Sequence, residues 1–180
     1  MNKSKLERRL LEIRAIDNEG EKMLIEGYAI IFDQPATHDY GGRKFTETIR
    51  AGALDKADMK DVPLRYNHND NVMIMARTRN KSLRLIQEEK GLKIQAELLD
   101  TQSNRDLYKA IREGLIDKMS FAFTVADKGD TWTFGEKEIR REVNNIAKLW
   151  DVSVVDTPFY DSTSIYARSL ELLESEEKRL

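Results

Sequence analysis

The sequence predicts an α+β protein with a mixed, mostly antiparallel, β-barrel-like core flanked by a few helices. Three observations predict it. A chain of 180 residues suits one domain with a real core. Short segments of alternating apolar and polar residues recur along most of the chain, separated by turn residues. Few segments have helical spacing, and no regular strand–helix–strand units occur, so we expect about nine short strands and two or three helices.

The first half of the chain is expected to be extended. Strands are predicted over residues 5–16, 23–32, 44–49, 61–66, 72–77, 82–87 and 91–99. The segment 23–32 is apolar at both alternating sets of positions, which is typical of a strand buried on both faces. Residues 38–43 are polar and contain two glycines, which predicts a flexible loop, and residues 52–60 predict a short helix.

The second half begins with a change of period. Ser103-Asn104-Arg105-Asp106 resembles a capping box, and apolar residues at helical spacing follow it up to Leu115. Strands are then predicted over residues 118–126, 131–134, 138–143 and 146–156. Residues 1–167 are expected to form a single domain, and residues 168–180 a charged amphipathic helix or frayed tail.

Composition excludes several kinds of chemistry. The chain has no cysteine, which removes thiolate nucleophiles, disulfides and Cys-based zinc sites. Two histidines cannot build a three-His zinc site, although two His plus a carboxylate would remain open. Gly41-Gly42 lacks the rest of a phosphate-loop motif, and no G-x-S-x-G elbow occurs. We expect neither a cofactor nor a metal.

Charge and hydropathy limit the partners. The net charge is −2 and the pI about 5.8, without a basic stripe, which argues against a dedicated nucleic-acid binder. No apolar run approaches the roughly 20 residues that span a bilayer, and the first residues lack the apolar stretch of a signal peptide. A soluble, cytosolic protein without a membrane partner is expected.

Two residues stand out as candidate reactive groups. His68 follows a predicted strand in the polar turn 66–70, so it is either an exposed turn histidine or a general base, because free imidazole titrates at about 6.5. Ser120 shares a small, weakly polar strand face with Ala122 and Thr124. That face is either an ordinary sheet surface or a site where a nucleophile is held on a rigid strand.

The third candidate is Asp151, an acid within an apolar strand. Trp150, Val152 and Val154 are expected on the apolar face, with Asp151 and Ser153 opposite. An unpaired acid is costly to bury, so Asp151 is either an outward-facing residue or a carboxylate that orients a histidine. The spacing of the three candidates neither proves nor forbids a triad, because triads are defined in space. A cluster of Glu97, Asp100 and Asp106 is better explained by strand-end and helix-start positions.

Five segments in order resemble the prohead proteases of tailed phages, capsid-maturation serine proteases related to herpesvirus assemblins. The segments are Gly27–Phe32, Ile49–Leu54, Pro63–Asn69 with Arg77 after it, Gly114–Phe123, and Leu149–Val155 followed by Pro158. The resemblance covers most of the chain, from about residue 27 to residue 158, and implies an assemblin-like fold.

The resemblance implies roles for the three candidates. His68 is the general base, Ser120 the nucleophile and Asp151 the third member, at a position where the family more often carries Glu. Ala122 stands where the family's serine motif commonly has Gly. His38 lies outside the matched segments, which makes it a surface or dispensable histidine. Arg140 and Arg141 are conceivable helpers for the oxyanion.

The implied activity is that of a serine endopeptidase acting inside the immature capsid, in the host cytoplasm. Its implied substrates are a scaffold protein or the precursor of the major capsid protein, and the protease itself, with self-cleavage expected in the charged stretch after Tyr166. Two alternatives stay open. The chain could be a non-catalytic capsid-assembly or scaffold-like β-domain, or a metal-dependent hydrolase that uses His68 with carboxylates, which the shortage of histidines disfavours.

Overall fold

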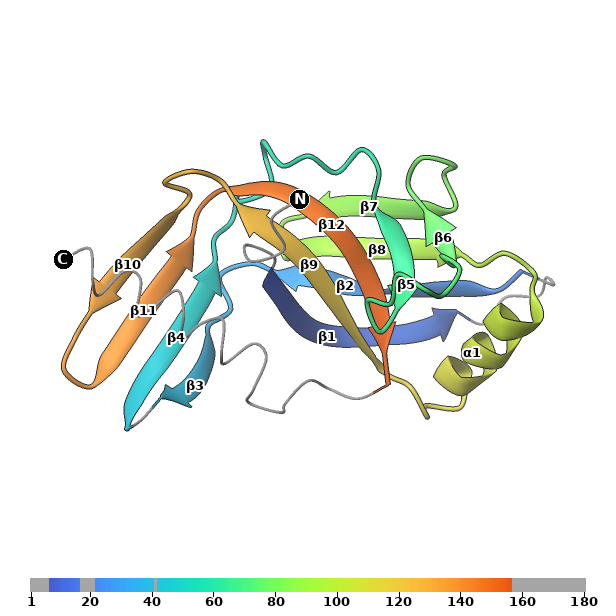
Figure 1. Ribbon diagram of the computed structural model, residues 1–180, viewed down its shortest axis with the longest axis horizontal. Coiled ribbons are helices and arrows are strands. Elements are labelled where there is room, and N and C mark those ends of the chain that lie inside the picture. Colours follow the sequence, from blue (N-terminus) through green and yellow to red (C-terminus); the bar gives the residue numbers. More distant parts are fainter. Residues whose placement is uncertain (1–6, 17–21, 41, 157–180) are drawn as a thin grey trace.

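The computed structural model describes residues 7–16, 22–40 and 42–156 (Figure 1). The elements in chain order are β1 (Glu7–Ile16), β2 (Leu24–Ile31), β3 (Ala36–Tyr40), β4 (Arg43–Ile49), β5 (Pro63–Tyr66), β6 (Ala76–Arg77), β7 (Leu83–Glu88), β8 (Gly91–Glu97), α1 (Gln102–Arg112), β9 (Lys118–Val125), β10 (Asp130–Phe134), β11 (Glu138–Val143) and β12 (Ile146–Val155). The predicted mixed, mostly antiparallel β core is confirmed. The assemblin-like character of the fold stays a prediction.

Eight strands form the main sheet, in the order β6-β5-β12-β9-β1-β2-β8-β7. All neighbours are antiparallel except β5 and β12. The edge strands β6 and β7 contact each other, so the sheet curls into a nearly closed barrel (Figure 1). Alternate residues of each strand fill its interior, where Phe121 and Phe123 stack with ring centroids 5.3 Å apart.

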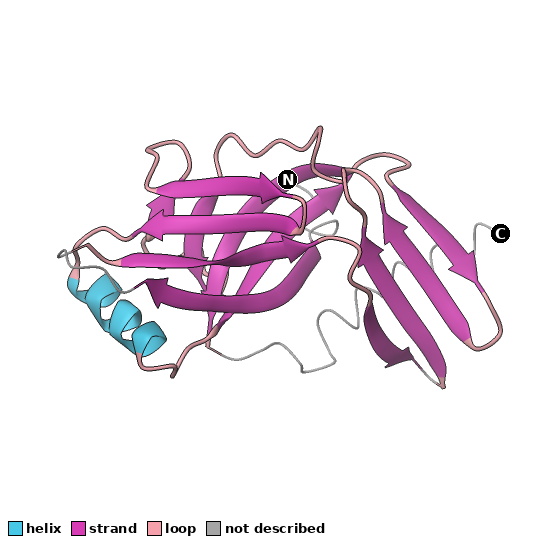
Figure 2. Ribbon diagram, turned by 180° about the vertical axis from the view of Figure 1, so that it is seen from behind, coloured by secondary structure: helices cyan, strands magenta, loops and turns pink. Residues whose placement is uncertain are grey.

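The remaining four strands form a second sheet that extends beyond one end of the barrel (Figure 2). Their order is β10-β11-β4-β3, and β11 runs parallel to β4. A separate hydrophobic cluster belongs to this sheet, in which Phe45 and Ile139 are buried and Trp132 and Phe134 pack against them. The single core that the sequence predicts is therefore joined by a smaller second one.

The helices are fewer than predicted, because α1 is the one helix of the described segments. The segment expected to be helical at 52–60 instead forms separate turns, in which Ala53, Asp55 and Ala57 each bond to the carbonyl three residues back. Gly52 has a positive φ of 85°, which breaks a right-handed helix at its start. The tail predicted at 168–180 lies outside the described residues.

Three other elements also differ from the prediction. The helix N-cap is Thr101, not Ser103: its extended backbone and its side chain, which accepts the Asn104 N–H, place Ser103 inside the first turn. The loop expected at 38–43 is mostly strand, because residues 38–40 of β3 pair with residues 43–45 of β4. The strand expected at 72–77 is limited to β6.

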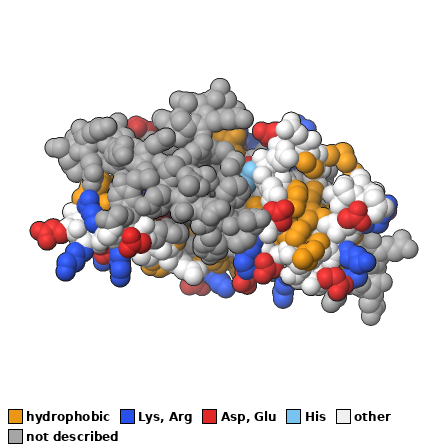
Figure 3. Space-filling view, turned by 60° about the horizontal axis from the view of Figure 1, so that its bottom comes forward, with side chains coloured by type: hydrophobic (Ala, Val, Ile, Leu, Met, Phe, Trp, Pro, Cys, Tyr) orange, Lys and Arg blue, Asp and Glu red, His pale blue; other side chains and the backbone are white. Residues whose placement is uncertain are grey.

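The surface of the described residues carries mixed charge. Figure 3 shows acidic and basic side chains interspersed on one face of the molecule, as the near-neutral net charge leads one to expect. Within the described residues, no helix combines the length and apolar character needed to cross a bilayer.

Candidate active site

Strands β9 and β12 bring Ser120, Asp151 and Ser153 onto one face of the barrel sheet. Ser153 lies directly opposite Ser120, and Asp151 opposite Ala122. The intervening residues of both strands point into the core, so these four point to the other face. Directly opposite residues of an antiparallel pair have Cβ atoms about 4.5–5.5 Å apart. The prediction that Ser120 and Ala122 share the small face of their strand therefore agrees with the structure.

A β-bulge sets the position of Asp151. The pairing of β12 with β9 shifts between Leu149 and Asp151, so Trp150 is an extra residue in β12. Leu149 consequently packs in the core opposite Phe123, while Asp151 reaches the outer face, although the two would share a face in a regular strand. The predicted apolar face is wrong in one residue: Trp150 is not in the core, and its Nε1 donates to Thr124 Oγ1 (3.4 Å).

His68 reaches the same face from the end of β5. This strand pairs in parallel with β12, so its end lies beside Val154, whose carbonyl accepts the Asn67 N–H (2.9 Å). The chain then reverses in a turn closed by the Asn69 N–H and the Tyr66 carbonyl (3.0 Å). Asn67 and His68 both have positive φ, 50° and 53°, as in a type I′ turn. Positive φ is uncommon in non-glycine residues, although Asn and His adopt it more readily than most.

A compact network joins His68 to β12. His68 Nδ1 lies 2.5 Å from Asp151 Oδ1, and Ser153 Oγ lies 2.9 Å from the same oxygen. The His68 backbone N–H donates to Ser153 Oγ (3.2 Å). The exposed fraction of the His68 side chain is 2%, and that of the Asp151 side chain 10%. This geometry assigns the imidazole proton to Nδ1, because a carboxylate only accepts hydrogen bonds.

The other imidazole nitrogen, Nε2, has no hydrogen-bond partner within the part of the chain that the structure describes, although it is buried. With the proton on Nδ1, Nε2 carries a lone pair that can accept a proton. Buried polar atoms of this kind are rare and call for an explanation, of which a catalytic role is one. Ser120 is 4% exposed, and its Oγ makes no hydrogen bond among the described residues. It lies near the network because its cross-strand neighbour Ser153 contacts His68 Nδ1 at 3.1 Å.

The two residues that precede His68 tie its turn to the end of β12. Tyr66 Oη donates to Asp156 Oδ2 (2.5 Å), and the Asp156 N–H donates to Asn67 Oδ1 (3.2 Å). The hydrogen bond to the Asp156 carboxylate raises the pKa of Tyr66 above its ordinary value, and burial adds to this. These bonds fix the N-terminal half of the turn, which helps to hold the imidazole in place beside Asp151.

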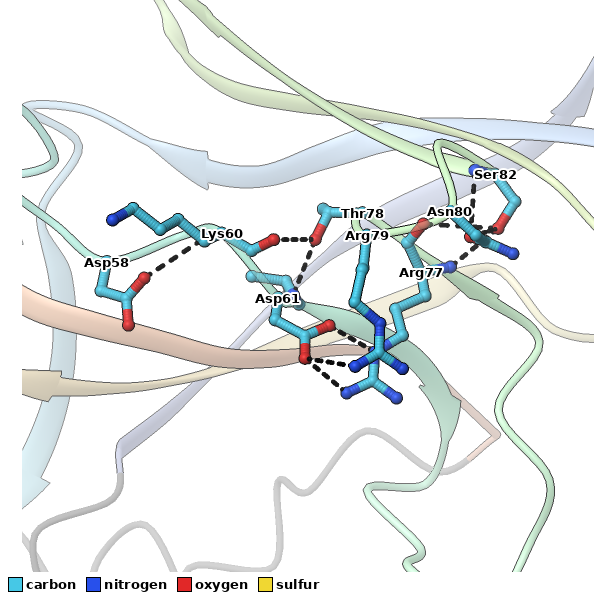
Figure 4. Close-up of polar contacts among 9 residues, drawn as sticks. Asp58, Lys60, Asp61, Arg77, Thr78, Arg79, Asn80 and Ser82 are labelled. Carbon is cyan, nitrogen blue, oxygen red and sulfur yellow. Dashed lines mark hydrogen bonds and ion pairs between the residues drawn. The ribbon is translucent and has the colours of Figure 1, made fainter.

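The loop that runs from His68 to β6 is also fixed at its C-terminal end, where the chain returns to the barrel sheet. Arg77, on β6, forms a bidentate ion pair with Asp61, through its Nε and through Nη2 at 2.7 Å (Figure 4). The Arg77 guanidinium keeps the pKa of Asp61 below its ordinary value. Thr78 Oγ1 accepts the Val62 N–H (2.8 Å) and donates to the Lys60 carbonyl (3.1 Å), as Figure 4 also shows in part. Both ends of the loop are therefore anchored beside β5.

The other candidates lie elsewhere. His38 is on β3, in the four-stranded sheet. Arg140 and Arg141 are on β11 of that sheet: Arg140 pairs with Glu138, and Arg141 is buried against Glu47, so neither helps at this site. Sequence reasoning missed the contacts of Ser153. Its place two residues from Asp151 on the same strand face was the available signal.

Comparisons with known proteins address the family. The family model described as caudovirus prohead serine protease matches residues 9–176. Among solved structures, the bacteriophage T4 capsid assembly protease gp21 is similar, with a TM-score of 0.46 and 17% identity over 84% of this chain and 99% of that chain. No curated protein sequence matches the chain significantly. Because the family model covers nearly the whole chain, this protein is a member of the caudovirus prohead serine protease family.

Proposed function

We propose that the chain is a serine endopeptidase in which Ser120 is the nucleophile, His68 the general base and Asp151 the residue that orients the imidazole. One observation carries this proposal: a buried His–Asp pair, 2.5 Å apart, lies on the sheet face that presents Ser120. Family membership supports proteolysis, and the free lone pair of Nε2 supports the role of His68 as proton acceptor.

The proposed reaction follows from these positions. His68 Nε2 takes the hydroxyl proton as Ser120 Oγ bonds to a peptide carbonyl carbon, and the imidazolium is stabilised by Asp151 through Nδ1. The same proton then passes to the leaving amine, which leaves an acyl-enzyme. Water, deprotonated by His68, releases the acid product and restores the hydroxyl.

The proposed substrates are proteins of the immature capsid. These are a scaffold protein or the capsid precursor, together with the protease itself, and the reaction takes place in the assembling head within the host cytoplasm. Family membership in prohead proteases supports this assignment. The metal-dependent alternative gains no support, because no group of three or more potential ligands is found among the described residues.

The test uses a reagent that reports serine activation directly. When a fluorophosphonate reacts with an activated serine, the serine oxygen bonds to phosphorus, fluoride leaves and the hydroxyl proton passes to the base. Labelling therefore requires the activated nucleophile but no knowledge of the natural substrate. The wild-type protein should be labelled once, on Ser120, and should cleave purified capsid precursor into discrete fragments. Ser120→Ala should abolish both, while Ser103→Ala, at an exposed helix serine, should abolish neither.

The result also decides between enzyme and non-catalytic domain. If the wild-type protein is not labelled and leaves the precursor intact, the chain is a non-catalytic capsid-assembly or scaffold-like domain. If Ser120→Ala folds and still cleaves the precursor, another residue is the nucleophile. Mass spectrometry of the labelled peptide and of the fragments measures both outcomes.

A further inference from the structure

Ser153 is fully buried, although its side chain is polar. Its exposed fraction is 0%, on a strand whose neighbouring residues Val152 and Val154 are core. A buried hydroxyl is tolerated when its hydrogen bonds are satisfied. The single hydroxyl proton goes to Asp151 Oδ1 (2.9 Å), and a lone pair accepts the His68 backbone N–H (3.2 Å). The second lone pair faces His68 Nδ1–H (3.1 Å).

These contacts join two segments that are far apart in the sequence. Asp151 is on β12 with Ser153, whereas His68 belongs to the strained turn after β5, 85 residues earlier than Ser153. One oxygen atom therefore holds the carboxylate and the histidine backbone at the same time. Without it, the Asp151 carboxylate would keep one of its two hydrogen bonds at Oδ1 and could rotate, and the turn would lose its backbone anchor to the β12 side chains.

We propose that Ser153 is a positioning residue that fixes the Asp151 carboxylate and the backbone of His68 relative to each other. This rests on the proposed function of the His–Asp pair. Ser153 does not touch the substrate in this proposal; it acts through Asp151 and His68. Because Ser153 is also the cross-strand neighbour of Ser120, the same residue sets the separation between the nucleophile's strand and the imidazole.

The first test is Ser153→Ala, measured as the rate of fluorophosphonate labelling of Ser120. We expect the maximal labelling rate to fall by about 10- to 100-fold, the range that partners of site residues show in well-studied metal sites, with the half-saturating probe concentration unchanged. Thr46→Ala is the control, since Thr46 Oγ1 also makes two side-chain hydrogen bonds, with Glu138 and Thr37, but in the four-stranded sheet, away from the pair. A wild-type rate in Ser153→Ala would overturn the proposal.

A double-mutant cycle separates positioning from general destabilisation. If Ser153 acts through Asp151, its removal should slow labelling far less in an Asp151→Asn background than in the wild type. Equal fold-losses in the two backgrounds would mean that Ser153 only supports the fold, and would refute a positioning role. Thermal unfolding of each variant confirms that the rates are compared between folded proteins.

Failure of this inference is distinguishable from failure of the proposed function. If wild-type Ser120 is not labelled, the proposed function falls first. If Ser120 is labelled, Asp151→Asn slows labelling and Ser153→Ala does not, the proposed function stands and the role of Ser153 alone is refuted.

Discussion

Glu26 offers the sharpest test of how the barrel is held together. It lies on β2 between β1 and β8, and its cross-strand neighbours Arg14 and Gln95 both bond to its carboxylate, at 2.7 and 3.2 Å. Lys93 Nζ lies 3.0 Å from Oε2. The hydrogen bond from Arg14 and then that from Lys93 lower the pKa of Glu26 from 4.5 to about 2. Glu26→Gln keeps the size of the side chain and removes the charge.

The lowered pKa gives the size and the sign of the effect. A drop from 4.5 to about 2 corresponds to about 3 kcal/mol at roughly 1.4 kcal/mol per unit. Because the Arg14 side chain is 77% exposed, solvent screening reduces the expected contribution to about 1–2 kcal/mol. A carboxylate with a lower pKa in the folded protein stabilises it above the unfolded pKa, and this stabilisation disappears as the pH falls towards 2.

Urea unfolding in a Ser120→Ala background, which removes the proposed nucleophile and with it any self-digestion by that route, is the assay. At neutral pH, Glu26→Gln should lower the free energy of unfolding by about 1–2 kcal/mol, and the difference should shrink to less than half near pH 3. Glu12→Gln is the control: Glu12 is 87% exposed and pairs with Lys118 at 3.5 Å, so its loss should change little. A Glu26→Gln difference that is zero at neutral pH, or constant with pH, would refute the reasoning.

Three further predictions concern the two sheets. Asp151→Asn should slow labelling of Ser120 by about 10⁴-fold, because Asn no longer fixes the imidazole tautomer; unchanged labelling would assign the orienting role elsewhere. In the His38→Gln variant, Ser120 should be labelled at the wild-type rate, since β3 belongs to the four-stranded sheet. A large fall in the labelling rate would implicate a second imidazole. Glu47→Gln should lower the free energy of unfolding in urea by about 1–3 kcal/mol, because the buried Arg141 (3% exposed) loses one charged partner and keeps Asp130 (2.7 Å); a change below about 0.5 kcal/mol would show that the Glu47–Arg141 pair is dispensable.

Strand alternation alone was enough to place Ser120. Strand β9 pairs with β1 without interruption, from Lys118 opposite Glu12 to Phe123 opposite Glu7. The alternation of side chains along β9 therefore predicts correctly which residues face the core. The same rule failed at Trp150, because a bulge is defined by the partner strand and leaves no mark in a single run of residues. Regular elements are thus readable from the chain, whereas an irregularity in pairing is not.

The proximity of His68 to Asp151 could be recognised only from the structure. Nothing in the sequence between them indicates that β5 pairs in parallel with β12, or that Asn67 and His68 adopt positive φ. The resemblance to prohead proteases named the residues, but the hydrogen bonds of Ser153 follow from the packing of the turn onto β12. Non-local pairing, which local propensity does not encode, decides this part of the site.

The parallel pairing of β5 with β12 has a consequence for the order of events during synthesis. His68 and Asp151 are 83 residues apart, so the ribosome releases the histidine long before the strand that completes its environment. Until β12 (Ile146–Val155) inserts between β5 and β9, no imidazole–carboxylate pair exists. If His68 and Asp151 act as proposed, a nascent chain lacks the completed pair, and peptidase competence arrives with the closing of the sheet as a late, non-local step of folding.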